Sequence, residues 1–180
     1  MPEPILVPYD PAWSETFAQM CEVYAAALEG LSVAIEHVGS TAIPGLMAKP
    51  ILDIDIVIPT REALPEVVVR LAKLGYRHNG DQGIPEREVF KASESTAPYT
   101  EPSRIWMAHH LYVCHADSAE LRRHLQFRDA LRRSPELCAE YERLKCETAL
   151  AAQGDRKVYA RLKETTCRAF VEQVLENPLK

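Results

Sequence analysis

The chain has 180 residues, of which 47% are hydrophobic and 26% are charged, and this composition excludes collagen-like, disordered and coiled-coil proteins. A chain of this length can bury a core without disulfides or a structural metal. Five scattered cysteines without a CxxC pair favour reduced thiols and argue against a zinc site. No apolar run reaches the ~20 residues of a membrane span, and the first four residues do not resemble a signal peptide. We therefore expect a cytoplasmic protein with no membrane partner.

Charge is unevenly divided along the chain. The net charge of −5 argues against nucleic acid as a partner bound through bulk charge. Residues 1–116 carry 8 basic and 15 acidic side chains, whereas residues 117–180 carry 13 and 11. Any attraction for a polyanion must therefore be local, and the later segment is the expected contributor. Because eleven of the thirteen prolines precede residue 103, we expect a sheet domain at 1–116 and a helical tail at 117–180, packed as one compact unit.

Hydrophobic periodicity and turn residues predict the elements in chain order. The front part reads as a helix from Asp10-Pro11 to Gly30, strands at 33–38 and 51–58, a helix at 62–74, and strands at 76–79, 86–91 and 104–114. Three helices follow at 117–133, 134–153 and 155–176, the first with a capping-box-like start at Asp117 and Glu120. Strand and helix do not alternate strictly, so an α/β (α+β) fold with a mixed sheet and helical cover is favoured over a doubly wound parallel sheet.

Two acidic residues interrupt the apolar strand at 51–58. Side chains alternate along a strand, so Asp53 and Asp55 share one face while the isoleucines between and after them face the core. The two positions lie about 6.6–6.8 Å apart along the strand, and the carboxylates repel unless a positive charge lies between them. Mg²⁺ would supply that charge and suits phosphoryl chemistry. Alternatively, one aspartate caps a turn and the other pairs with Lys49 or an arginine.

Gly39-Ser40 directly follows the strand at 33–38. Glycine permits close backbone approach there, and freed N–H groups with a hydroxyl can hold a phosphate, although the same dipeptide also makes an ordinary turn. Lys49 precedes Pro50, which favours an extended conformation. Its ammonium therefore either points toward a phosphate or balances the aspartates.

Three further residues are candidates for the same site. His110 shares a strand face with Tyr112 and is interpreted as a third metal ligand, a proton carrier, or a hydrogen-bonded strand histidine. Arg87 follows a constrained turn and can grip a carboxylate or phosphate. Arg128 either presents positive charge to the site or belongs to a solvated helix face that pairs with Asp129.

The string from His37 to Val57, HVGSTAIPGLMAKPILDIDIV, resembles the signature of the DNA polymerase beta-like nucleotidyltransferase superfamily. Within that superfamily it is similar to the GrpB family (UPF0157), and the resemblance continues through His109–Val113 and Phe127–Arg132 to Lys163. It implies a nucleotidyltransferase-like fold whose Asp53 and Asp55 bind Mg²⁺ or Mn²⁺. It further implies a nucleoside triphosphate as substrate, whose nucleotidyl group is transferred to an unknown acceptor.

This sequence departs from the superfamily pattern at the third carboxylate of the metal site. Superfamily enzymes usually add a third carboxylate from a later strand, where this sequence has His109, His110 and Tyr112. Two alternatives therefore stay open beside the transferase. One is a noncatalytic nucleotide- or anion-binding module on the same fold. The other is a metal-dependent phosphohydrolase that uses Asp53, Asp55 and His110.

Overall fold

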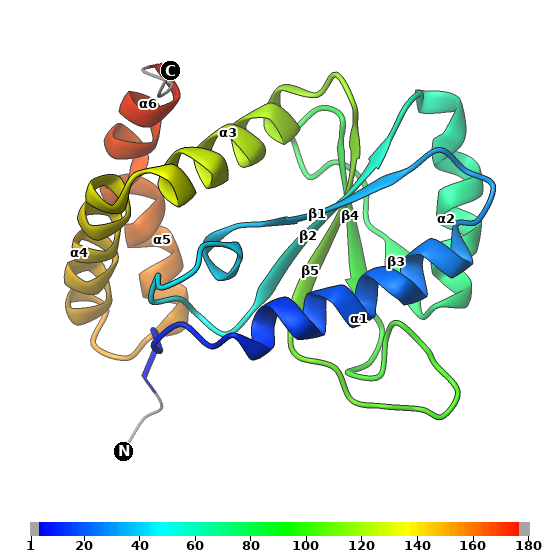
Figure 1. The fold of residues 1–180 in the computed structure, drawn as a ribbon, viewed down its shortest axis with the longest axis horizontal. Helices are drawn as coiled ribbons and strands as arrows, with labels where there is room; N and C mark the ends of the chain where they lie inside the picture. Colours follow the sequence, from blue (N-terminus) through cyan, green and yellow to red (C-terminus); the bar gives the residue numbers. More distant parts are fainter. Residues whose placement is uncertain (1–3, 177–180) are drawn as a thin grey trace.

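The computed structural model describes residues 4–176, and its centre is a five-stranded mixed sheet (Figure 1). The strands are β1 (Ala34–Val38), β2 (Leu52–Ile58), β3 (Tyr76–His78), β4 (Arg87–Ala92) and β5 (His109–His115). They lie in the order β1-β2-β5-β4-β3, in which β2 and β5 are parallel and every other pair is antiparallel. The mixed α/β fold predicted from the sequence is confirmed.

Six α-helices pack around this sheet within residues 4–176. They are α1 (Ala12–Ala27), α2 (Leu64–Lys73), α3 (Ala119–Arg133), α4 (Pro135–Ala151), α5 (Arg156–Thr166) and α6 (Arg168–Glu176). The main core cluster joins α1 and α2 to the buried Leu52, Ile54 and Ile56 of β2, as strand alternation predicts. The other four helices gather on one side of the sheet (Figure 1). No helix in the described part of the chain is long and apolar enough to cross a membrane.

The prediction of a strand over 104–114 was wrong in its first half, because β5 begins only at His109. Residues 104–108 form a loop in place of the predicted strand. Trp106 in this loop is buried, and its indole Nε1 donates to the carbonyl of Pro98 at 2.8 Å. Arg104 lies over the same ring, 4.3 Å from its centroid. The β-forming residues here reflect the packing of a loop around one tryptophan.

The last predicted helix, 155–176, is two helices that meet at Cys167. Neither proline nor glycine occurs in this stretch, so the sequence carries no breaker at the junction. Buried Cys167 and Phe170 belong to a core cluster in which the Phe170 ring stacks on Tyr141 of α4 at 5.6 Å. Tertiary packing therefore overrides the local helical pattern. The predicted stop signal, Asn177-Pro178, lies outside the described residues.

The start of α3 also differs from the capping box predicted at Asp117 and Glu120. Ser118 is the N-cap, and its buried hydroxyl accepts from the backbone N–H of Leu121 at 3.0 Å. Glu120 instead turns toward His124, one turn further along α3. The cap fixes where α3 begins, and with it the position of the side chains that α3 sends toward the sheet.

We expect Ser118→Ala to lower the free energy of unfolding by about 0.5–2 kcal/mol, because a backbone N–H loses its partner in a buried position. Asp117→Ala, at an exposed neighbour, should change it by less. Urea unfolding of both variants measures the difference. A larger loss for Asp117→Ala would contradict the assignment of the cap.

Candidate functional site

The site begins on the face of β2 that is turned away from the main core. Asp53 lies opposite His110 of β5, and Asp55 lies opposite Tyr112. The Asp53 carboxylate is one-third exposed, whereas Asp55 is completely buried. Two residues of the same type on one strand face therefore occupy very different environments.

Asp53 forms a pair with His110. The imidazole Nδ1 of His110 donates to Oδ1 of Asp53 at 2.8 Å, and this hydrogen bond raises the pKa of His110. The ring is more than half exposed, so its other nitrogen is open to molecules that enter from solvent. The pair therefore has the geometry of a proton carrier that is oriented by a carboxylate.

Gly39 packs directly against this pair. Its backbone has φ 71° and ψ −171°, a region that only glycine adopts readily. A Cβ at this position would lie 2.3 Å from Oδ2 of Asp53. The glycine of the predicted phosphate turn is thus required for the chain to pass beside Asp53. The next residue, Ser40, begins a short 3-10 helix, η1 (Ser40–Ala42).

Asp55 is held by His124 of α3, a residue that the sequence analysis does not place in the site. Nδ1 of His124, on α3, donates to Oδ2 of Asp55 at 2.7 Å, and Nε2 lies 3.2 Å from Oε1 of Glu120. Burial lowers the pKa of His124, but the two carboxylates outweigh it and raise the pKa to about 9. The imidazole is therefore a cation between two anions. Within the described residues, Oδ1 of Asp55 is buried without a hydrogen-bond partner.

Arg87 and Arg128 lie outside the cavity described below. The Arg87 guanidinium stacks over the Tyr112 ring at 4.8 Å. Arg128 donates to Oε2 of Glu36 at 2.7 Å and to the carbonyl of His37 at 3.0 Å. It thereby fastens α3 to β1, because this side of the helix faces the first strand. The structure does not bring these two predicted phosphate ligands to the other candidates.

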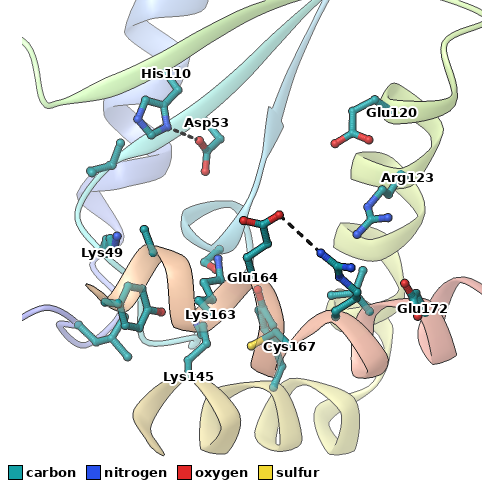
Figure 2. A pocket seen from close by; sticks show the side chains of 18 of the residues that line it. Lys49, Asp53, His110, Glu120, Arg123, Lys145, Lys163, Glu164, Cys167 and Glu172 are labelled. Atoms are coloured by element: carbon teal, nitrogen blue, oxygen red, sulfur yellow. Dashed lines mark hydrogen bonds and ion pairs between the residues drawn. The ribbon is translucent and has the colours of Figure 1, made fainter. Parts of the chain in front are cut away.

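A cavity of about 700 Å³ opens between Asp53 and the helical tail (Figure 2). It collects four of the predicted residues, Ser40, Lys49, Asp53 and His110. The opposite wall comes from the tail and includes Glu120 and Arg123 of α3, Tyr141 and Lys145 of α4, and Tyr159, Lys163, Glu164 and Arg168 at or after α5. The site is therefore shared between the sheet and the four final helices.

Three lysines meet at the floor of this cavity. Lys49 lies over the Tyr159 ring at 4.5 Å, and Lys145 and Lys163 lie 5.1 and 5.9 Å from the centre of Tyr141. Among residues 4–176, no carboxylate forms an ion pair with any of the three. Burial and the neighbouring Lys163 lower the pKa of Lys145 to about 7. Lys145 also donates to the carbonyl oxygen of Met47, so the floor gathers three lysine nitrogens that have no carboxylate partner among the described residues.

Sequence reasoning did not place Lys163, Arg123 or His124 in the site. A usable signal for the lysines was the repeated spacing Tyr-x-x-x-Lys, which occurs at Tyr141–Lys145 and again at Tyr159–Lys163. This spacing puts the ring and the ammonium on one helix face. No comparable signal marks His124, whose partner Asp55 lies 69 residues earlier in the chain.

The predicted metal ligands do not form a metal centre in this arrangement. Within the described range, no group of three histidine, cysteine or acidic side chains is placed to hold an ion. Asp53 gives one oxygen to His110, and Asp55 gives one to His124 and is closed to the cavity. Asp53, Asp55 and His110 therefore do not fit a resident metal as they stand.

We expect Gly39→Ala to lower the free energy of unfolding by at least about 1–3 kcal/mol, because alanine is strained at this φ and ψ and its methyl group would collide with Asp53. Gly45→Ala is the matched control, since its φ is 82° but a Cβ would meet nothing within 4 Å. Urea unfolding compares the two variants. Equal losses would show that the contact with Asp53 imposes no constraint.

Comparisons with known proteins agree with this architecture. A family model described as GrpB protein matches residues 3–175. A UPF0157 protein of Pseudomonas aeruginosa is 35% identical over 170 residues, which cover 94% of this chain and 67% of that protein. The crystal structure of GrpB from Enterococcus faecalis has a TM-score of 0.76 at 27% identity and covers 96% of this chain and 98% of that one.

A more distant likeness concerns the fold alone. The Cid1 poly(U) polymerase has a TM-score of 0.52 at 9% identity, over 77% of this chain and 42% of the polymerase chain. The mixed sheet of this chain thus has the fold that is also found in this polymerase. Since the family model spans nearly all of the sequence, the chain belongs to the GrpB family.

Proposed function

We propose that this protein binds the phosphates of a nucleoside triphosphate in the cavity and transfers its nucleotidyl group to an acceptor hydroxyl. The observation that carries the proposal is the meeting of Lys49, Lys145 and Lys163 across the cavity from the Asp53–His110 pair. The shared fold supports it, because the Cid1 structure of that fold is described as bound to MgATP. The acceptor is a small molecule or a protein.

The lysine floor suits a polyphosphate. Burial and the neighbouring Lys163 lower the pKa of Lys49 and Lys145, and an entering polyanion would favour their charged forms and be held by charge-assisted hydrogen bonds. The volume of the cavity falls within the usual range for sites that take small molecules and cofactors. Ser40 adds a hydroxyl at the wall from which Asp53 projects. The phosphates would therefore lie between the tail lysines and the Gly39-Ser40 turn.

The opposite wall supplies a base. With Nδ1–H directed at Asp53, the neutral ring of His110 has its lone pair on Nε2, which can accept the proton of an acceptor hydroxyl. The oxygen then forms a bond to the α-phosphorus as the bond from that phosphorus to the pyrophosphate oxygen breaks. The lysines stabilise the charge on the departing pyrophosphate. Mg²⁺ or Mn²⁺ brought in by the nucleotide remains a prediction that calorimetry with each ion tests.

One observation favours a second candidate, the noncatalytic nucleotide- or anion-binding module. Asp55, the second acid of the motif, is internally paired with His124 and does not face the cavity. Binding without release of pyrophosphate would be the result of that arrangement. Release of phosphate without pyrophosphate would instead identify the phosphohydrolase.

We expect Lys145→Met and Lys163→Met each to weaken ATP or UTP binding by about tenfold or more, because each removes a charged hydrogen bond while keeping side-chain volume. Lys91→Met, on the exposed face of β4, is the control and should bind as the wild type does. Isothermal calorimetry measures the affinities, and a pyrophosphate assay measures turnover. Asp53→Asn should keep binding and lose turnover. Unchanged affinity in both cavity variants would contradict the proposal.

Nucleotide binding should be accompanied by proton uptake. With a pKa of about 7, Lys145 is only partly protonated at neutral pH in the free protein, and a neighbouring phosphate favours its charged form. We therefore expect uptake of a fraction of a proton per nucleotide at pH 7, measured by calorimetry in buffers of different ionisation enthalpy. The uptake should shrink in Lys145→Met. Proton release, or uptake unchanged by that substitution, would be the contrary result.

A further inference from the structure

The buried half of the site has an unusual charge arrangement for a strand that bears two neighbouring acids. Asp55 has no exposed surface, and His124 contacts it from α3 at 2.7 Å. The other nitrogen of the same ring is 3.2 Å from Glu120. Nδ1 is hydrogen-bonded to Asp55 and Nε2 lies within ion-pair distance of Glu120, so both nitrogens of this ring are directed at carboxylates of the protein.

The His124 ring occupies an Asp55 oxygen that a divalent metal ion would need as a ligand. A metal bound by Asp53 and Asp55 would have to contact an oxygen of Asp55, and one of the two oxygens already accepts from His124. The remaining oxygen is closed off from the cavity. A metal there would also lie within a few Å of the imidazolium, where like charges repel strongly in a partly dry environment.

Arg87 and Cys114 also lie in the buried part of the site around Asp55 and Tyr112. Arg87, from β4, places its guanidinium over the ring of Tyr112, the residue opposite Asp55 on β5, and its Nε is buried without a partner in the described residues. Cys114 of β5 is buried next to this group. Among the described residues, Asp55 and Glu120 are the two acids that form ion pairs with the His124 ring.

We propose that the His124 ring, which donates to Asp55 and lies beside Glu120, occupies the place of a metal ion at Asp55, so that this protein has no resident two-carboxylate metal site. Of the two aspartates of β2, only Asp53 then faces the cavity, where Lys49 and the tail lysines would meet the phosphates. This inference goes beyond the proposed function. It holds or fails independently of nucleotide binding, because it concerns the metal alone.

The test measures Mn²⁺ binding in the absence of nucleotide, by electron paramagnetic resonance of free Mn²⁺ and by calorimetry. Wild-type protein should bind Mn²⁺ no more tightly than scattered surface carboxylates do, and Asp55→Asn should not change that affinity. His124→Asn keeps a donor toward Asp55 but removes the charge, and it should gain a Mn²⁺ site at least about tenfold tighter. His115→Asn, a histidine at the end of β5, should show no gain.

The gained site should disappear in the double variant His124→Asn, Asp55→Asn. The proposal is overturned if wild-type protein binds Mn²⁺ tightly and loses it in Asp55→Asn, a result that does not depend on the fold of any His124 variant. It is also overturned if folded His124→Asn, checked by circular dichroism, gains no affinity. Should His124→Asn not fold, His124→Lys, which keeps the charge, should fold and bind Mn²⁺ as weakly as wild type. Tight binding by that variant would contradict the proposal.

Discussion

Two carboxylates lie on one face of the buried strand β2, where they repel each other and lose hydration unless a hydrogen-bond donor or a positive charge lies beside each. The other groups of the site supply those partners. The parallel pairing of β2 with β5 places the acids opposite His110 and Tyr112, in a sheet whose other face is apolar core. Each of the two aspartates has a different histidine partner. Asp53 is turned to the cavity and accepts a hydrogen bond from His110, whereas Asp55 is covered by α3 and hydrogen-bonded to His124. Asp53 therefore stays accessible from the cavity, whereas Asp55 connects β2 to α3 through His124.

The helical tail provides the positive half of the site. Core packing between Tyr141 and Phe170 bends the chain at Cys167, and the two Tyr-x-x-x-Lys turns on α4 and α5 then present their lysines to one cavity. Neither the sheet nor the tail has a complete site by itself. The comparisons show the family and the fold. The proposed nucleotidyl transfer rests on how the sheet and the helical tail face each other across the cavity.

Local pattern was sufficient to predict the order of the elements and the core face of β2, because strand alternation and helical period are short-range properties. It also indicated Asp53 and His110, since both lie on predicted strands. It could not indicate that Arg128 faces β1 or that His124 reaches Asp55, because these contacts span 92 and 69 residues and depend on how α3 is rotated. The missed cap at Ser118 shows the same limit on a smaller scale, since one residue of register decides which oxygen meets the free N–H.

The central claim is that phosphate is held by lysines while Asp55 is neutralised from within the protein. Crystals soaked with Mn²⁺ and a nonhydrolysable nucleoside triphosphate, analysed by anomalous scattering, would test it in one map. The account predicts phosphate density beside Lys49, Lys145 and Lys163, with any manganese peak on the phosphates and Asp53 only. A strong peak that bridges Asp53 and Asp55, with His124 displaced, would contradict it.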